Sequence, residues 1–349
     1  MKRLQGATGD SGTGFASEWG MFDPKPYLKE LARGKNGARD LTRTDARTLF
    51  SAVFAGEVSD VALGALLVAL RVKGESLEEL GGMMDALQPH IRPMELPARR
   101  AIPVLIPSYN GARKIANLVP LLALLLARED VPVIVHGVHQ EAARVGTFEI
   151  LEILGHPRVA SIDEAEERLE AHKLASVPVG VLSPDLAKLI DVRNATGVRN
   201  SGHTLAKLMV PNGVAPGAAC RLIAVTHPDF LKLLRDYFTA SPANVFLMRG
   251  VEGEAVVRLH APQPIEELRA DGAPVTHLIG EGDADFSLPA RDAAATAQWT
   301  REVLDGKTRA PLALLREVTL IVEHCRTAAN AGRPGLKLVA SNGPLNQKA

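Results

Sequence analysis

The sequence predicts an α/β protein in which a small all-helical N-terminal domain precedes a larger, doubly wound domain with a mostly parallel sheet. Two observations lead to this fold class. Residues 24–88 carry helical signals throughout, whereas beyond a proline-rich crossing at residues 89–100 short apolar runs alternate with helical stretches. A βα repeat of this kind binds ligands at the carboxyl ends of its strands.

The N-terminal helices are identified by their ends. Gly34, Gly56 and Gly74 each close a helical pattern. Ser76 and Glu79 have the spacing of a capping box, which marks the start of a further helix. The four expected helical segments occupy residues 24–34, 41–56, 58–74 and 76–90. They are short and amphipathic, so we expect them to pack on one another.

The larger domain is expected to alternate strands and helices. Six apolar runs are expected as strands, at residues 101–107, 131–137, 177–183, 219–226, 244–250 and 275–282. Helices are expected at residues 114–129, 146–155, 161–173 and 228–240. The chain therefore divides into a disordered leader over residues 1–22, a helical domain over residues 23–90 and an α/β domain over residues 91–340. The leader contains "GATGDSGTG", which is similar to a phosphate loop, but no strand precedes it.

The composition restricts the class of function. The chain has 349 residues, and its 40 basic residues balance its 40 acidic residues, so any surface for nucleic acid has to be a local basic patch. Only Cys220 and Cys325 are present, without a CxxC motif, which indicates a reducing compartment. The longest apolar run, residues 118–127, is about half as long as a bilayer span. We therefore expect a cytoplasmic protein without a cysteine-built zinc site.

The helical segment resembles the N-terminal domain of glycosyltransferase family 3, the superfamily of anthranilate phosphoribosyltransferase and nucleoside phosphorylase. The spacing between "GEVSD" at residues 56–60 and "ALRVKGES" at residues 69–76 carries this resemblance. Later landmarks follow in order: "HG" at residues 136–137, "DVRNATGVRN" from Asp191 and "RGVEGE" from Arg249. The resemblance covers residues 27–335 and implies the two-domain fold and a homodimer that pairs through the helical domain.

The sequence departs from this superfamily at the loop that the resemblance assigns to the donor phosphates. The phosphoribosyltransferases have a glycine-rich GTGGD loop whose amides hold pyrophosphate, whereas this chain reads "PSYNG" at residues 107–111. Tyr109 and Asn110 fill space and remove the conformational freedom that glycine provides. The Tyr109 ring either stacks on a base or packs in the core.

Two cations follow this loop. Arg113 and Lys114 are expected in the first turn of the next helix, where free amides already favour an anion. A loop of this character can hold a phosphate diester without a metal. The alternative is that both side chains are ordinary surface charges.

The magnesium site that the resemblance implies is altered as well. The superfamily uses an adjacent Asp-Glu pair, and here a glycine separates Glu252 from Glu254. Mg²⁺ needs near-octahedral oxygens from carboxylates, water and substrate phosphate, so both the altered pair and the filled loop weaken the site. The alternative interpretation of residues 250–255 is a solvated turn between a strand and a helix. We expect no cofactor, with Mg²⁺ bound only if transferase activity is retained.

A second basic cluster lies at residues 191–213. By resemblance, Arg193 falls where the transferases place an arginine for the anthranilate carboxylate, so this cluster binds either a carboxylate or a phosphate backbone. His203 within it is more often a structural histidine. The superfamily also has a KHGN motif. In this chain Val135 and Val138 flank His136 and Gly137, so both polar positions of the motif are apolar. The candidate contacts for phosphate or nucleic acid are Ser108, Tyr109, Asn110, Gly111, Arg113, Lys114, His136, Arg193, Arg199, Asn200 and Lys207.

Two functions remain open. In the first, the chain is most similar to a bacterial DNA-binding offshoot of the anthranilate phosphoribosyltransferases, in which "PSYNGARK" replaces the glycine loop. This resemblance implies a homodimer that binds DNA or RNA without sequence specificity. In the second, the chain is a pentosyltransferase with a phosphoribosyl pyrophosphate-like donor and another acceptor than anthranilate. No catalytic nucleophile is evident, and this reaction does not need one. We favour the first, because the loop keeps a turn glycine and gains paired cations.

Overall fold

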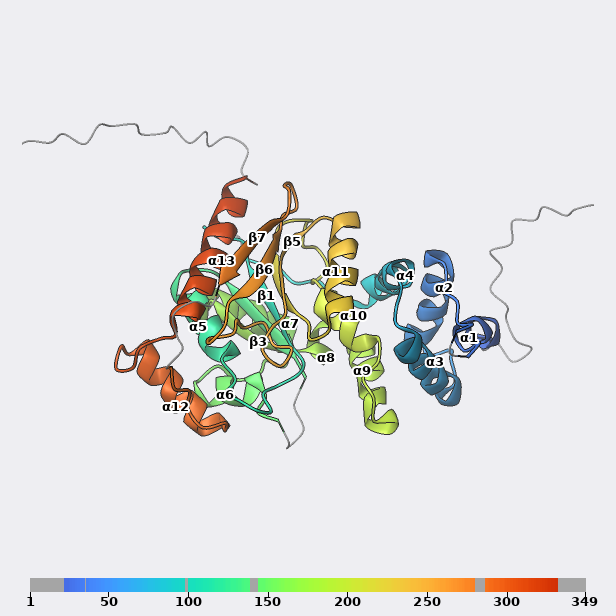
Figure 1. The fold of residues 1–349 in the computed structure, drawn as a ribbon, viewed down its shortest axis with the longest axis horizontal. Coiled ribbons are helices and arrows are strands. Elements are labelled where there is room, and N and C mark those ends of the chain that lie inside the picture. Colours follow the sequence, from blue (N-terminus) through green and yellow to red (C-terminus); the bar gives the residue numbers. More distant parts are fainter. Residues whose placement is uncertain (1–21, 35, 98–99, 139–143, 280–285, 332–349) are drawn as a thin grey trace, which may run out of the picture. The chain divides into compact units, whose positions relative to one another are not determined.

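The computed structural model describes residues 22–34, 36–97, 100–138, 144–279 and 286–331 (Figure 1). The leader expected over residues 1–22 lies outside this part of the chain, except for Phe22. The chain divides into two compact units. One unit contains residues 1–93, 178–212 and 232–240, as far as these are described, and the other contains the remainder.

The first unit is helical in its described residues. Its elements are α1 (Lys25–Leu31), α2 (Arg43–Phe54), α3 (Asp60–Lys73), α4 (Leu77–Leu87), the 3-10 helix η1 (Gln88–His90), α8 (Val179–Leu182), α9 (Pro184–Thr196), α10 (Gly202–Leu208) and most of α11 (Pro228–Ala240). Helices α2 and α4 pack closely on each other because Gly82 has no side chain. A Cβ atom there would lie 2.2 Å from the Arg43 carbonyl oxygen. The structure confirms the four N-terminal helices that the sequence predicts.

The capping box at the start of α4 is a buried junction of this unit. The Ser76 hydroxyl accepts a hydrogen bond from the Glu79 amide, and the Glu79 carboxylate accepts one from the Ser76 amide. Glu79 is fully buried, and its carboxylate also accepts from the Leu41 amide at 2.9 Å and from Lys73 Nζ at 2.7 Å. These charge-assisted bonds offset the burial of the carboxylate and join α3, α4 and the segment before α2.

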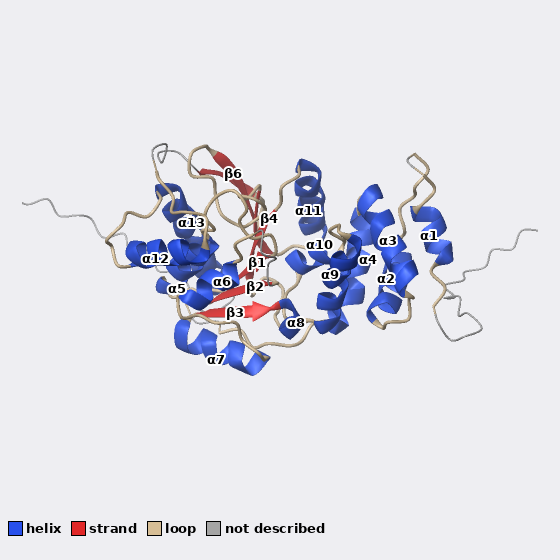
Figure 2. Ribbon diagram, turned by 90° about the horizontal axis from the view of Figure 1, so that it is seen from below, coloured by secondary structure: helices blue, strands red, loops and turns tan. Residues whose placement is uncertain are grey.

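The second unit is built on a seven-stranded sheet (Figure 2). Its strands are β1 (Val104–Ser108), β2 (Val133–Gly137), β3 (Leu174–Pro178), β4 (Cys220–Ala224), β5 (Asn244–Met248), β6 (Gln263–Leu268) and β7 (Val275–Ile279). The strand order is β3-β2-β1-β4-β5-β6-β7. Strand β1 pairs in parallel with β2 and β4, and β4 pairs in parallel with β5, whereas β6 pairs antiparallel with both β5 and β7. The α/β class and the mostly parallel sheet are confirmed.

Four helices gather on one side of this sheet (Figures 1 and 2). They are α5 (Val119–Arg128), α6 (Thr147–Ile153), α12 (Ala293–Leu304) and α13 (Leu312–Ala331), and α7 (Ile162–His172) precedes β3. Helix α5 contacts each of the other three and strand β2. The buried core therefore lies between these helices and strands that are apolar on both faces, such as β1 and β5. No helix in the described residues has the length and hydropathy that crossing a membrane requires.

The structure differs from the expectation at two strands, and it also contains the helices α9, α10, α12 and α13, which the sequence did not predict. The strand expected at residues 177–183 is shifted: β3 ends at Pro178, and the run Val179–Leu182 forms the short helix α8. Periodicity does not distinguish a short buried strand from a buried helical turn. Strand β6 was not expected at all, because it carries polar residues that face inward. Gln263 and Glu267 are both buried there, and the Glu267 carboxylate is bonded to His324 Nδ1 at 2.7 Å.

Candidate functional site

The candidate site is the loop between β1 and α5, at the carboxyl end of a central strand. The expectation that Arg113 and Lys114 occupy the first turn of a helix was wrong, because α5 begins at Val119. Pro120 is at the start of α5, and it lacks the amide proton that a longer helix would need at this position. The Asn117 side-chain oxygen accepts from the Val119 amide at 3.1 Å and closes the turn before the helix.

Tyr109 fills the base of the loop. Its side chain is 1% exposed, and its hydroxyl lies 2.9 Å from His136 Nδ1 on strand β2. The two rings are 5.6 Å apart at an interplanar angle of 74°. Burial lowers the pKa of His136 to about 3 and raises the pKa of Tyr109, so both groups are neutral at neutral pH. Of the two alternatives for Tyr109, this arrangement is core packing, since base stacking requires an exposed ring.

Buried polar contacts fix the two ends of the loop. Ser108 Oγ lies 2.7 Å from Thr147 Oγ1, which also accepts from the Asn117 amide group at 2.9 Å. Asn110 is buried, and its side-chain amide donates to the Gly253 carbonyl at 2.7 Å. The side chains of Ser108 and Asn110 are therefore engaged in holding the loop to α6 and to the segment after β5.

The central feature of the site is that the loop amides are already hydrogen bonded within the chain. Glu254 Oε1 accepts from the amides of Asn110 and Gly111, each at 2.8 Å. Glu252 accepts from the amides of Arg113 at 2.7 Å and Lys114 at 3.1 Å. The Ala112 amide between them donates to the Val145 carbonyl at 2.9 Å. All five amides from residue 110 to residue 114 are thus occupied, four of them by carboxylates.

The backbone of residues 250–254 is shaped to bring these carboxylates to the loop. Gly253 has φ of +86°, and a Cβ atom on it would lie 2.2 Å from the Asn110 side-chain nitrogen. Glu252 itself has φ of +54°, which is uncommon for a residue with a side chain. A glycine therefore stands between the two glutamates because the backbone approaches the loop too closely for any other residue.

This geometry does not fit a magnesium site. The Glu252 and Glu254 carboxylates face amide protons of the loop, and three of their four oxygens accept hydrogen bonds from it. The fourth, Glu254 Oε2, is buried without a hydrogen-bond partner in the described residues. The described residues also contain no group of three or more His, Cys, Asp and Glu side chains that could hold a metal ion. Mg²⁺ requires several oxygens converging in octahedral geometry, and these two carboxylates are engaged elsewhere.

Cations surround the outer side of the loop. The side chains of Arg113 and Lys114 are exposed. Arg144 donates to the carbonyls of Asn110 at 3.1 Å and Gly111 at 3.3 Å, and Arg291 donates to the Arg113 carbonyl. Sequence reasoning missed Arg144 and Arg291, because each is an isolated cation in the sequence and only the fold brings it to the loop.

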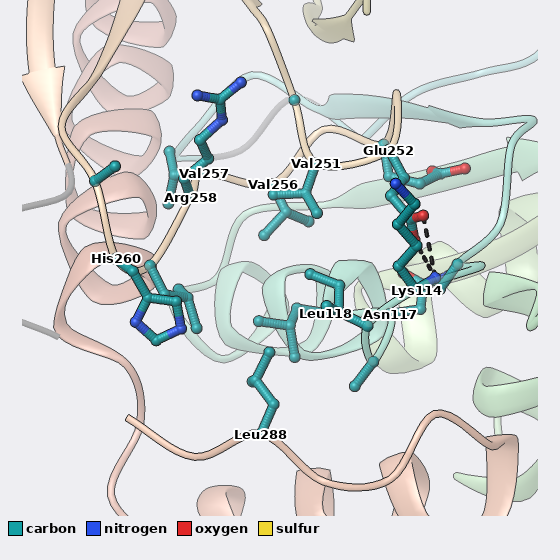
Figure 3. Close-up of a pocket in the computed structure, with 17 residues that line it drawn as sticks. Lys114, Asn117, Leu118, Val251, Glu252, Val256, Val257, Arg258, His260 and Leu288 are labelled. Carbon is teal, nitrogen blue, oxygen red and sulfur yellow. Dashed lines mark hydrogen bonds between the residues drawn. The ribbon is translucent and has the colours of Figure 1, made fainter. Parts of the chain in front are cut away.

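A cavity of about 540 Å³ opens beside the loop (Figure 3). Its walls are mainly apolar and include Leu118, Val256 and Leu288, while Lys114 and Glu252 stand at one end. Dashed lines in Figure 3 mark the hydrogen bonds from the Lys114 amide to the Glu252 carboxylate. The volume is in the range of small-molecule sites, which is about 300–1,000 Å³.

The second predicted cluster lies in the other unit, on α9 and α10. Arg193, Arg199 and Lys207 are half-buried there. Asn200 is buried, donates to the Leu189 carbonyl at 2.8 Å and accepts from the Gly202 amide at 3.0 Å, so its side chain stabilises the turn between the helices. Burial and the nearby Arg199 lower the pKa of His203 to about 3. The predicted residues are thus divided between the two units.

Comparison with known proteins identifies relatives of this chain. A family model described as "Glycosyl transferase family, helical bundle domain" matches residues 25–90. The chain is 40% identical over 294 residues to the uncharacterized protein YbiB of Escherichia coli (strain K12), covering 84% of this chain and 91% of YbiB. It is 28% identical over 284 residues to the anthranilate phosphoribosyltransferase of Thermus thermophilus, covering 78% of this chain and 82% of that enzyme.

Solved structures agree with these relatives. The crystal structure of anthranilate phosphoribosyltransferase (TrpD) from Thermus thermophilus superimposes with a TM-score of 0.67 at 26% identity, covering 87% of this chain and 89% of that chain. The Saccharomyces cerevisiae enzyme in complex with PRPP and Mg gives a TM-score of 0.66 at 13% identity, covering 88% and 93% of the two chains. The second likeness is one of fold.

Proposed function

We propose a function for this chain that starts from its family. The chain belongs to the anthranilate phosphoribosyltransferase-like proteins of glycosyltransferase family 3. The proposed function is binding of DNA or RNA without sequence specificity, in the cytoplasm, by a protein whose donor-phosphate loop has been rebuilt. Family membership gives the fold, and the hydrogen bonding of the loop favours this function over a transferase.

The observation that carries the proposal is the occupation of the loop amides. A loop that holds pyrophosphate by its amides has to leave them free to donate. Here Glu252 and Glu254 accept from four of them, and Tyr109 fills the space below. A phosphoribosyl pyrophosphate donor would meet two carboxylates where it needs amide protons, which disfavours binding of its negatively charged phosphates.

The cations of the loop support the nucleic-acid side of the proposal. Arg113, Lys114 and Arg291 carry exposed side chains around one loop. Phosphates of a nucleic-acid backbone bind such side chains without base readout, so this contact gives affinity without sequence specificity. Arg193, Arg199 and Lys207 of the helical unit are further candidates for backbone contacts.

The test is binding of the purified full chain to a labelled mixed-sequence oligonucleotide over a series of salt concentrations. We expect affinity that falls steeply with salt and is unaffected by phosphoribosyl pyrophosphate with Mg²⁺. Absence of oligonucleotide binding, together with saturable binding of phosphoribosyl pyrophosphate, would instead establish the transferase alternative.

The same proposal includes a homodimer that pairs through helix α3. Val61, Ala65, Val68 and Val72 are all exposed and lie at helical spacing on one face of α3, and two of them are exposed by 85% and 80%. Four exposed apolar residues in one stripe are unusual for a helix that faces only water. A second copy of the helical unit would cover this stripe with the same residues.

Substitution of the stripe tests the dimer. We expect Val68→Glu with Val72→Glu to raise the dimer dissociation constant by at least about 100-fold, because charges would be buried without partners in the interface. Sedimentation equilibrium would measure the change. Leu278→Glu, at an exposed apolar residue of β7, is the matched control and should leave the dimer unchanged. A monomeric wild-type chain would refute the proposed interface.

A further inference from the structure

The cavity of about 540 Å³ lies within the unit that contains the sheet. Its walls come from the segment before α5, from residues 250–261 and from Leu288, all of which belong to that unit. Figure 3 shows Lys114 at one end of the cavity and His260 at the other, with apolar side chains such as Val256 between them. The cavity is thus a mainly apolar space with a lysine at one end.

The wall formed by residues 250–261 offers few hydrogen-bond groups to a ligand. The amides of Val251, Glu254 and Val256 donate to carbonyls of the same segment at 2.9–3.1 Å. The Val257 amide donates to the buried carboxylate of Glu317 at 3.1 Å. A polar group inserted deep into the cavity would lose water without gaining a partner from this wall. The wall therefore favours a ligand body that is held by shape and apolar contact.

The Lys114 end of the cavity is cationic. Lys114 lines the cavity, the side chain of the neighbouring Arg113 is exposed, and Arg291 donates to the Arg113 carbonyl. Glu252 is the carboxylate at this end, and its oxygens accept from the amides of Arg113 and Lys114. The three cationic side chains more than balance this carboxylate, so a negatively charged chain is attracted to this end of the cavity.

A nucleotide of a single strand has both of the required parts. Its backbone phosphate is anionic and binds lysine and arginine side chains, and its base has two apolar faces. The two parts belong to one nucleotide, so a phosphate at Arg113 and Lys114 places its base beside the cavity. An unpaired base leaves its stack at a modest cost in free energy, whereas a base in a duplex also has to give up its pairing.

We propose that the cavity holds one unstacked nucleobase of a single-stranded nucleic acid whose backbone lies along Arg113 and Lys114. This inference rests on the proposed nucleic-acid function and specifies which part of the partner enters the protein. The amides of the wall are bonded within the chain, so the cavity contacts the faces of the base and does not read its edge. Every base has such faces, which agrees with binding that does not depend on sequence.

The experiment compares two end-labelled single strands of equal length by fluorescence anisotropy with the full chain at one salt concentration. One strand has a mixed sequence, and the other has the same sugar-phosphate backbone without bases. Both carry the same number of phosphates, so the contacts of Arg113 and Lys114 are available to each. We expect the mixed-sequence strand to bind at least about fivefold more tightly, which is the lower end of the contribution of one stacked base.

A variant of the cavity wall assigns this difference to the cavity. Leu288 is half-buried, so Leu288→Ala removes apolar contact for the base without opening the core. We expect it to weaken binding of the mixed-sequence strand about threefold and to leave the strand without bases unchanged. Leu315→Ala is the matched control, because it removes an exposed leucine of α13 that does not line the cavity. It should leave the binding of both strands unchanged.

The outcomes separate the base site from the proposed function. Equal affinity of the wild type for the two strands would overturn the base site and keep the nucleic-acid function. An equal loss for both strands in Leu288→Ala would also overturn it, since the leucine would then act on the fold or on the backbone contacts. Absence of binding to either strand would refute the nucleic-acid function and this inference with it.

Discussion

Glu254→Ala is expected to lower the free energy of unfolding by about 3–5 kcal/mol, because it leaves two buried amides without an acceptor. In the native protein Glu254 Oε1 accepts from Asn110 and Gly111, each at 2.8 Å. Both residues are buried, so water cannot replace the carboxylate without opening the loop. Each unsatisfied buried donor costs about 1–3 kcal/mol, and the side chain also leaves an empty volume.

Urea denaturation followed by circular dichroism would measure this loss, with Glu252→Ala as the comparison. Glu252 also binds two loop amides, but these lie at the exposed end and can be hydrated, so its loss should cost only about 1–2 kcal/mol. The contrast rests on burial, because the number of amides is the same. Equal losses for the two variants would show that Glu254 does not support the loop in the way that its burial indicates.

The fold was largely predictable because its signals are local. The capping box of Ser76 and Glu79 was recognised from spacing alone and is present, since a cap depends on residues three positions apart. The apolar runs that became β1, β2, β4 and β5 are buried, apart from the half-buried Arg221 of β4, and are separated by helical periodicity. Such features survive because local preference and tertiary packing agree.

Strand β6 is one of the elements that were not predicted, and its polar residues are buried by long-range pairing. Glu267 on β6 bonds with His277 on β7 and with His324 on α13, each at 2.7 Å. Its partners lie 10 and 57 residues away in the sequence. A buried carboxylate in a strand is stable only with such partners, and no single-sequence pattern indicates which distant histidines will supply them.

The sequence drew attention to the loop after β1 and to Glu252 and Glu254, but it did not indicate the hydrogen bonds that join them. The loop after β1 was identified as rebuilt, and Glu252 with Glu254 as displaced from a metal site. The sequence could not indicate that the changed loop and the changed glutamate pair bind each other. The Asn110 amide donates to Glu254, which lies 144 residues further along the chain. Considered alone, the changed loop is the loss of a glycine-rich phosphate loop, and the changed glutamate pair is the loss of a magnesium site. Together they place carboxylates of the chain itself on the amides of the loop, which is a property of the tertiary structure.

Reversing the charges of Arg113 and Lys114 is expected to weaken oligonucleotide binding by about 25-fold or more at 0.1 M salt. Each phosphate contact to a single strand contributes about 0.7 to the slope of the logarithm of affinity against the logarithm of salt concentration, so the loss of two contacts should reduce the slope by about 1.4. Arg113→Glu with Lys114→Glu also places repulsive charges beside the phosphates. The weakening should be the same for all sequences, because backbone contacts do not read bases.

The control for this variant has to change net charge equally without touching the loop. Lys307→Glu with Arg326→Glu does so, since both side chains are exposed cations of the same unit and pair with Asp305 and Glu129. If both double variants lose affinity equally and keep the wild-type salt slope, the effect is one of net charge and the loop makes no contact. If only the loop variant loses slope, the phosphates lie at Arg113 and Lys114, beside the amides that Glu252 occupies in the free protein.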